Sequence, residues 1–326
     1  MVLPIPAKKI TEREVRLAYE LILGRLPEND DVVRAHVATG GSLRTLREEL
    51  LRSQEFHSKV GASLAIRSPA WPPIDVEVDA SAEVLARLFK RVESNRSELG
   101  RREPYWSVLA EDRFKSASLS AENIDRFYDS GKESLALFEV VTRRSGIDLG
   151  LYKSAFELGC GVGRVTTSLV TKFHTVCAAD VSLPHLKIAA DQTRARTGND
   201  RVDWLQLKSP RDLLAVKPFD VFYSVMVLQH NPPPLIDFLL STVLSKIKSG
   251  GIAYFQVQTY DLDYRFSTAE YLQSAKSEGK MEMHVLPQAR LWRILRDANC
   301  DLLEVREDAS TANPSGISNT VLARKR

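Results

Sequence analysis

The sequence has few cysteines and no long apolar run. Its three cysteines, Cys160, Cys177 and Cys300, are odd in number, widely spaced and without a C-x-x-C pair, which favours a reduced compartment. No stretch approaches the roughly 20 apolar residues that a membrane helix needs. The first residues, MVLPIPAKKI, contain two prolines where a signal peptide would have an apolar core. We therefore expect a cytoplasmic protein, with peripheral contact at the inner membrane left open.

Excess charge of one sign is also lacking. The 45 basic and 42 acidic residues are interspersed, the net charge is +3, and no Lys/Arg block stands out. Nucleic acid is therefore not an expected partner. The 326 residues, 44% of them hydrophobic, are enough for one large domain and a small one.

The first segment predicts a small helical domain over residues 1–66. Thr11 and Glu14 form a capping-box pair before a helical run of apolar residues, and Gly24 is expected to end that helix. Ser42 is the expected N-cap of a further helix. The strings ELILGRLP and RSQEFHSKV resemble a small helical module of bacterial proteins, often cell-surface or glycan-related.

Residues 67–104 are expected to connect this domain to the rest of the chain. The stretch 67–76 carries three prolines and predicts a linker. A helix is then predicted from Ser81 to about Arg96.

From about Ser154 the pattern alternates between strands and helices, which indicates an α/β fold with a parallel sheet. Helices are expected after Pro234 and after Pro287. Five strands are expected first, at 154–158, 174–179, 202–207, 219–225 and 251–258. Two more, joined by a loop containing Pro, Gly and Ser, predict a terminal hairpin at 301–307 and 317–325.

The first of these strands ends in FELGCGVGR, a loop with three glycines in the order G-x-G-x-G, at Gly159, Gly161 and Gly163. A dinucleotide fingerprint needs its third glycine at position 164, where Arg164 stands. Glu157 ends the strand, and Asp180 follows the next strand, where a carboxylate commonly binds ribose hydroxyls. Together these residues indicate a site for a ribose-containing cofactor. The alternatives are a structural turn and a solvent-facing aspartate.

The segments FELGCGVGR, AAD, FDVFYSVMVLQH and LSKIKSGG, in this order, resemble the class I methyltransferases that depend on S-adenosylmethionine. The resemblance covers residues 105–326. It implies a Rossmann-like seven-stranded sheet with a C-terminal antiparallel hairpin, and S-adenosylmethionine as cofactor. This cofactor has no phosphate, and glycines would let the backbone approach its methionine and ribose.

The cofactor-binding residues that this resemblance implies are Glu157, Gly159, Cys160, Gly161, Gly163, Asp180, Ser182, Lys208, Ser209, Ser224, Val225, Tyr128 and Gly131. Ser182 has helix capping as its alternative role. Tyr128 and Gly131 are expected to fold over the methionine end of the cofactor, or else to pack within a helical lid. Asp212 is a more distant candidate for contact with the adenine.

Methyl transfer to a hydroxyl group needs a proton acceptor, and two histidines are candidates for that role. His230 lies where the fourth strand ends, beside the methyl group in this fold, and its alternative role is to anchor the loop. His284 lies on the segment that usually covers the acceptor. No metal site is expected, because the stretch from Met226 to Pro234 lacks clustered acidic residues.

The segments PYWSVL, IDRFYDSG, MHVLPQ and SNTVLARK resemble bacterial methyltransferases linked to polysaccharide and cell-envelope glycan synthesis. The resemblance implies O-methylation of a sugar, nucleotide-sugar or glycan-linked acceptor. It also suggests a glycan-synthesis protein as partner of the N-terminal module. The alternatives are methylation of a small metabolite, or a regulator that binds S-adenosylmethionine without turnover.

Overall fold

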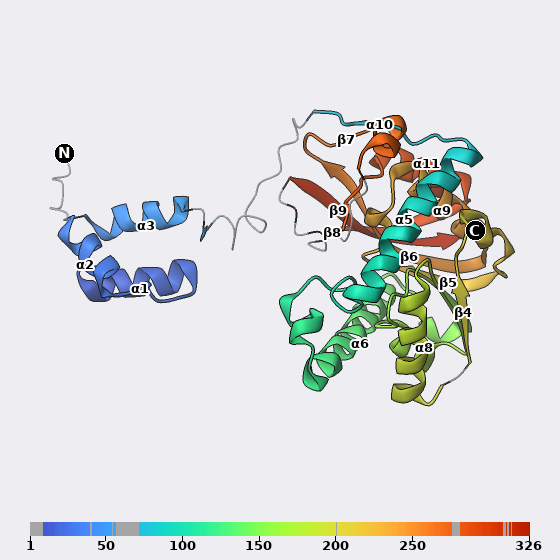
Figure 1. Ribbon diagram of the computed structural model, residues 1–326, viewed down its shortest axis with the longest axis horizontal. Helices are drawn as coiled ribbons and strands as arrows, with labels where there is room; N and C mark the ends of the chain where they lie inside the picture. The colour runs from blue at the N-terminus through green and yellow to red at the C-terminus, as the bar shows by residue number, and fades with distance from the viewer. Residues whose placement is uncertain are drawn as a thin grey trace. The chain divides into compact units, whose positions relative to one another are not determined.

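The computed structural model describes residues 9–39, 41–53, 55–56, 72–199, 201–275, 281–308, 311, 313 and 315–326. The chain divides into a small and a large compact unit between Ala70 and Trp71 (Figure 1). This point falls within the proline-containing segment 67–76, of which 67–71 lie outside the described residues. Residues 54 and 57–60 of the module's closing string also lie outside them.

The small unit is built from three helices, α1 (Glu12–Leu23), α2 (Asp30–Ala38) and α3 (Leu43–Arg52). The predicted capping box is confirmed, because Thr11 and Glu14 each accept a hydrogen bond from the other's backbone amide. Gly24 ends α1 with a φ of +64°, and Ser42 caps α3. The apolar faces of the helices form a core of Ile10, Val15, Ala18, Tyr19, Leu23, Val33, Leu46 and Leu50.

A seven-stranded sheet in the order β4-β3-β2-β5-β6-β9-β8 forms the centre of the large unit. Its strands are β2 (Ser154–Leu158), β3 (Thr175–Asp180), β4 (Val202–Gln206), β5 (Phe219–Ser224), β6 (Ile247–Asp261), β8 (Cys300–Asp308) and β9 (Gly316–Lys325). The first five are parallel, and β9 is antiparallel to both of its neighbours. The predicted fold class and terminal hairpin are confirmed.

Helices cover both faces of this sheet (Figure 1). One face packs against α5 (Ala82–Arg102), α9 (Pro233–Ser245) and α11 (Gln288–Asp297). The other packs against α6 (Ala121–Arg144), α7 (Thr166–Lys172) and α8 (Leu183–Thr197). Alternate strand residues serve the two cores, as in β5, where Phe222 joins the first core and Tyr223 the second.

Helix α5 belongs to the large unit and extends beyond the predicted end at Arg96. Ser81, where the helix was predicted to begin, is its N-cap, and Phe89 and Val92 join the core of the sheet. It crosses closely over α8, because a Cβ atom added at Gly100 would come within 2.5 Å of the Ser182 hydroxyl. The chain before the sheet therefore contributes a wall to the large unit.

A second, two-stranded sheet joins the start of the large unit to its later part. Strand β1 (Asp75–Val76) runs parallel to β7 (Arg265–Phe266), just before α10 (Thr268–Gln273). The Glu77 carboxylate accepts a hydrogen bond from the amide of Thr268 at 2.7 Å. Short 3-10 turns complete the unit at Asp112–Phe114, Ser116–Ser118, Leu149–Leu151, Pro210–Ala215 and Leu228–His230.

Candidate functional site

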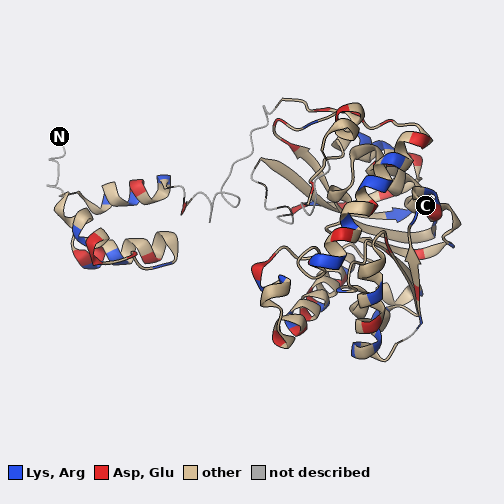
Figure 2. Cartoon of the chain, viewed as in Figure 1, with Lys and Arg blue, Asp and Glu red and all other residues tan. Residues whose placement is uncertain are grey.

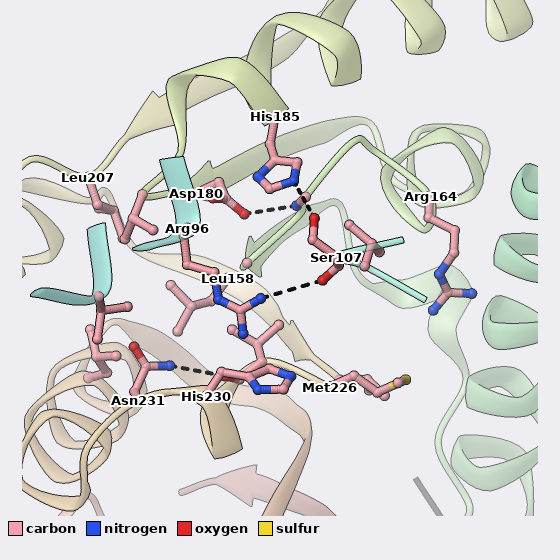
Figure 3. Close-up of a pocket in the computed structure, with 18 of the residues that line it drawn as sticks. Arg96, Ser107, Leu158, Arg164, Asp180, His185, Leu207, Met226, His230 and Asn231 are labelled. Carbon is pink, nitrogen blue, oxygen red and sulfur yellow. Dashed lines mark hydrogen bonds between the residues drawn. The ribbon is translucent and has the colours of Figure 1, made fainter. Parts of the chain in front are cut away.

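A cavity of about 810 Å³ opens where the parallel strands end, between the sheet and α5 (Figure 3). Carboxyl ends of parallel strands are where ligands bind in open α/β sheets. The glycine loop, the end of β3 and the exit of β5 all contribute to its wall. Its lining includes Arg96, Ser107, Leu158, Gly159, Gly161, Asp180, His185, Leu207, Val225, Met226, His230 and Asn231.

The glycine loop forms one wall with its backbone. Gly159, Gly161 and Gly163 have φ values of +75°, +55° and +82°, a region that favours glycine. A Cβ atom at position 159 would lie 2.4 Å from the side chain of Val227, and one at position 161 would lie 2.6 Å from Val108. Side chains at these two positions would therefore collide with the opposite side of the cavity.

Asp180 fixes this loop and faces the cavity. One carboxylate oxygen accepts the amide of Gly161 at 2.9 Å, and the other accepts the amide of Ser182 at 2.8 Å. Each carboxylate oxygen can accept a further hydrogen bond. Asp180 can thus accept ligand hydroxyls while it holds the loop in place.

Glu157 lies behind the loop, outside the cavity lining, and is buried. Its carboxylate accepts a hydrogen bond from the Thr166 hydroxyl at 2.5 Å. Burial raises the pKa of Glu157 to about 7, against the opposing effects of Thr166 and Arg164. A positive charge bound nearby would favour its ionised form.

Three further predicted cofactor residues support the loop from outside the lining. Cys160 is buried, and burial raises the pKa of its thiol. Position 163 faces α8, where an added Cβ would lie 3.2 Å from Ala189. Ser182 is the N-cap of α8, the alternative role considered for it.

The turn after β4 is held by a capping box. The Asp212 carboxylate accepts the amides of Lys208 and Ser209 at 2.7 and 3.0 Å. The Ser209 hydroxyl in turn caps the following 3-10 turn. Of this segment, Leu207 lines the cavity, whereas Lys208 and Ser209 do not. An adenine bound at this turn would therefore meet an apolar side chain, and not the side chains of Lys208 or Ser209.

The exit of β5 forms the floor. The Ser224 hydroxyl donates to the carbonyl of Leu158 at 3.0 Å, which ties the ends of β5 and β2 together, and Val225 lines the cavity. Met226 adopts a φ of +62°, and its amide donates to the Gln256 side chain at 2.9 Å. A non-glycine residue in this conformation is uncommon and marks a constrained loop.

His230 follows directly and lines the cavity with its ring. Its Nδ1 lies 2.9 Å from the main-chain oxygen of Glu282. Because a carbonyl oxygen only accepts, Nδ1 carries the proton and Nε2 keeps a lone pair. Burial, with a contribution from Arg96, lowers the pKa of His230 to about 3, so the ring is neutral at physiological pH.

His284 is buried beside this loop and does not line the cavity. Its Nδ1 lies 2.8 Å from the hydroxyl of Tyr264, and its Nε2 lies 3.5 Å from the Glu282 carboxylate. Its backbone amide donates to the carbonyl of Gln229 at 2.6 Å. It therefore connects the covering segment to the His230 loop.

Tyr128 and Gly131 lie on α6, against the back of the glycine loop. The Tyr128 hydroxyl donates to the carbonyl of Val162 at 2.8 Å. A Cβ atom at position 131 would lie 1.9 Å from the carbonyl oxygen of Arg164, so a glycine is needed there. The two residues brace the loop backbone and are not part of the cavity lining.

Sequence reasoning missed Arg96, Ser107 and His185, which lie together in the cavity wall (Figure 3). His185 Nε2 lies 2.8 Å from the Ser107 hydroxyl, and Arg96 donates to the Ser107 carbonyl at 3.4 Å. The one usable signal was the spacing of Phe89, Val92 and Arg96, which places them on one face of a helix.

A second, more polar cavity of about 910 Å³ shares Val92, Arg96 and His230 with the first. Its other lining residues are Arg91, Ser94, Asn95, Glu98, Arg101, Arg102 and Glu282. Within the described ranges, no group of three or more His, Cys, Asp or Glu side chains could hold a metal ion.

The sequence model of a family described as "Methyltransferase domain" matches residues 120–305. The magnesium protoporphyrin IX methyltransferase of Synechocystis PCC 6803, crystallised with SAH, is similar in structure with a TM-score of 0.51 and 13% identity, over 73% of this chain and 100% of that chain. The N-methyltransferase NodS of Bradyrhizobium japonicum WM9 has a TM-score of 0.45 and 16% identity, over 71% and 98%. No curated protein matched the sequence.

The fold likeness to the Synechocystis structure agrees with the sheet order and the terminal hairpin. The glycine loop, Asp180 and the cavity beside them lie at the carboxyl ends of the parallel strands, where ligands bind in open α/β sheets. Because the family match spans more than half of the 326 residues, the chain belongs to this methyltransferase family, and the predicted S-adenosylmethionine-dependent class is confirmed.

Proposed function

We propose that the chain O-methylates a sugar or glycan-linked acceptor, with S-adenosylmethionine as methyl donor. The observation that carries the acceptor part is the polar second cavity, which meets the first at Arg96 and His230. Its lining of serine, asparagine, arginine and glutamate supplies the donors and acceptors that a hydroxyl-rich molecule needs. The resemblance to glycan-associated methyltransferases points to the same acceptor class.

The residues around the first cavity suit the methyl donor. Asp180 can accept its ribose hydroxyls, Leu207 can pack on its adenine, and the backbone at Gly159 and Gly161 leaves room for its methionine. When bound, S-adenosylmethionine supplies an electrophilic methyl group on a positively charged sulfur. Arg164, which occupies the dinucleotide glycine position, donates to Ser130 and Ser134 of α6 at 3.0 and 2.9 Å.

The contribution of this chain to transfer is alignment, exclusion of water and control of one proton. Val225 and Met226 form an apolar floor, and α5 covers the cavity from the other side. His230 presents the unprotonated Nε2 of a neutral ring at the junction of the two cavities. It can accept a hydrogen bond from an acceptor hydroxyl and so orient the oxygen lone pair toward the methyl group.

A binding and transfer experiment tests this function. We expect the purified chain to bind S-adenosylmethionine and its demethylated product in calorimetry, and not NAD. Mass spectrometry should then show methylation of members of a panel of nucleotide sugars and oligosaccharides. Methylation restricted to small metabolites that are not sugars would contradict the acceptor class. Tight binding without methylation of any compound in either panel would favour a regulator without turnover.

No helix in the described part of the chain combines the length and the apolar character of a membrane span. We propose that the chain acts in the cytoplasm, as its cysteine usage predicts. Nucleotide sugars and donor cofactors are made in that compartment, so a cell fractionation that finds the chain with soluble proteins would support it.

A further inference from the structure

We infer that the acceptor carries an anionic group, a phosphate or a carboxylate, and that Arg96 binds this group beside the position of methyl transfer. The inference rests on the proposed function, because it narrows the acceptor of that same site. It is carried by the charge of the second cavity and by the surroundings of one guanidinium group.

The second cavity has an excess of positive charge. Four arginines and two glutamates line it, so its formal charge is +2. Most of these residues come from α5, along which Lys and Arg residues recur (Figure 2). A polar cavity with this charge favours an anionic occupant over a neutral or cationic one.

Ion pairs within the cavity leave one arginine without a counter-charge. Arg91 pairs with Glu282 at 3.3 Å, and Arg101 and Arg102 pair with Glu98 at 2.7 and 4.0 Å. Arg96 has no carboxylate within 4.0 Å among the residues that the structure describes. Its hydrogen bond to the carbonyl of Ser107, at 3.4 Å, is long.

Arg96 is also partly withdrawn from solvent. Its guanidinium lies inside the cavity between Asp180 and His230 (Figure 3). Burial lowers the pKa of Arg96, and the more distant carboxylates of Asp180 and Glu282 only partly compensate. The cost of partly removing a charge from water is offset by a paired opposite charge, so an anion at this position would supply the counter-charge that Arg96 lacks.

The carboxylate of the methyl donor is the competing partner for Arg96. Two features favour the acceptor. Arg91, Arg101 and Arg102 line the second cavity alone, so the positive charge extends away from the donor site. The donor also brings a positive sulfur, which repels a guanidinium nearby.

The planar guanidinium of Arg96 suits phosphate and carboxylate equally, since both accept paired hydrogen bonds. Sugar phosphates and nucleotide sugars carry the first group, and uronic acids carry the second. In either case the anion would lie next to His230, so the acceptor hydroxyl should be close to its charged group in the covalent structure.

Binding of four probes to the full chain, saturated with S-adenosylhomocysteine, tests the inference by calorimetry. The probes are glucose 1-phosphate, glucuronate, inorganic phosphate and methyl glucoside. We expect at least one of the two charged sugars to bind about 10-fold or more tightly than the neutral glucoside. The variant R96Q should bind that probe about 10- to 100-fold more weakly, as expected for loss of charge-assisted hydrogen bonds.

Matched variants make the result specific. R87Q alters an exposed arginine of the same helix that lines neither cavity, and should bind every probe as the unchanged chain does. The double variant R101Q/R102Q changes two exposed arginines, so it tests the cavity charge even if R96Q does not fold. It should weaken the binding of the charged sugars and leave the binding of methyl glucoside unchanged.

Two outcomes would overturn the inference, and a third would overturn the proposed function instead. If methyl glucoside binds as tightly as the charged sugars and R96Q changes nothing, the sugar site stands and the anion site does not. If R96Q weakens S-adenosylmethionine and S-adenosylhomocysteine instead, Arg96 belongs to the donor carboxylate. If inorganic phosphate binds through Arg96 as tightly as either sugar, the anion site stands and the sugar acceptor of the proposed function fails.

Discussion

Asp180, at the end of β3, accepts the backbone amide of Gly161 at 2.9 Å. The bond links the ends of two neighbouring strands, because Gly161 belongs to the loop that follows β2. One carboxylate thus shapes the glycine loop and faces the cofactor cavity at the same time. Its loss should affect both binding and local structure.

Asp180→Ala should weaken the binding of S-adenosylmethionine by about 1.5–3 kcal/mol, the range for hydrogen bonds to charged groups. It should also lower the melting temperature, since the amides of Gly161 and Ser182 lose their acceptor. Calorimetry and thermal unfolding measure the two effects. Asp180→Asn keeps one acceptor oxygen, so its affinity and melting temperature should lie between those of the wild type and Asp180→Ala. Wild-type affinity in Asp180→Ala would mean that other residues hold the ribose.

Glu157 gives a pH dependence of stability. Its pKa is raised to about 7 in the folded chain, so the folded state retains a proton that the unfolded chain releases near pH 4.5. The protonated Glu157 therefore makes its full contribution to stability below pH 4.5, and this contribution is lost as pH rises through 7. The free energy of unfolding of the wild-type chain should fall by up to about 3 kcal/mol between pH 5 and pH 8 because of this group. Glu157→Gln should not show this decrease. Urea unfolding of both chains at the two pH values measures it, and parallel pH profiles would contradict it.

His230→Asn and His230→Gln separate the two roles of the imidazole. Asparagine can reproduce the Nδ1–H bond to the Glu282 carbonyl, whereas glutamine places its amide near the position of Nε2. If Nε2 accepts the proton, His230→Asn should bind S-adenosylmethionine normally and turn over about 10²–10⁴-fold more slowly. If His230 only anchors the loop, His230→Asn should retain turnover, and His230→Gln should lose affinity and thermal stability together.

The lowered pKa of His230 also determines how protonation of this ring affects stability. With a folded pKa of about 3 and an ordinary value of 6.5, its contribution to stability is present above pH 6.5 and is lost as pH falls toward 3. His230→Asn should therefore lose less stability than wild type between pH 6.5 and pH 4. In turnover assays of the folded enzyme, we expect no decrease near pH 6.5 from this ring. Such a decrease, if absent in His230→Asn, would contradict the lowered pKa.

Gly161→Ala should destabilise the loop, and Val108→Ala should partly rescue it. The added Cβ would lie 2.6 Å from Val108 Cγ2, a contact that the smaller side chain relieves. Some loss should remain, because the φ of +55° is unfavourable for alanine. A double-mutant cycle of melting temperature and S-adenosylmethionine affinity measures the coupling. Additive effects would show that the contact does not limit substitution.

A chain that begins at Pro72 should bind S-adenosylmethionine as the full chain does, because the boundary between the units precedes it. A chain that begins at Ala80 should be less stable. It lacks strand β1, the Glu77 carboxylate that holds Thr268, and the Pro72 carbonyl that accepts from Tyr260 at 2.7 Å. Affinity and melting temperature of both truncations test this. Loss of binding in the longer one would mean that the helical module is required.

Much of the architecture could be predicted because it depends on local signals. The strand of residues 154–158 is an apolar run that ends at glycines, and its predicted bounds are those of β2. The terminal hairpin and the capping box of Thr11 and Glu14 follow from equally local chemistry. These patterns act within a few residues, so one sequence is sufficient to show them.

The position of the site could be predicted, but the complete set of residues that line it could not. Asp180 and Gly161 follow a motif with fixed spacing, and both line the cavity. Arg96 and His185 lie far apart in sequence and meet only because α5 crosses α8 at Gly100. No local pattern reports how helices cross, since crossing depends on the packing of the whole core.

The place of α5 in the chain has a consequence for folding. This helix is synthesised before every strand of the main sheet, yet Phe89 and Val92 share a hydrophobic core with Leu235 and Leu239 of α9, which come far later. Its apolar side has no permanent cover until those residues leave the ribosome. Contacts of such long sequence separation form late and slow folding. A nascent chain that stops before α9 should therefore expose this surface to chaperones, and the cavity wall with Arg96 should be among the last parts to become resistant to protease.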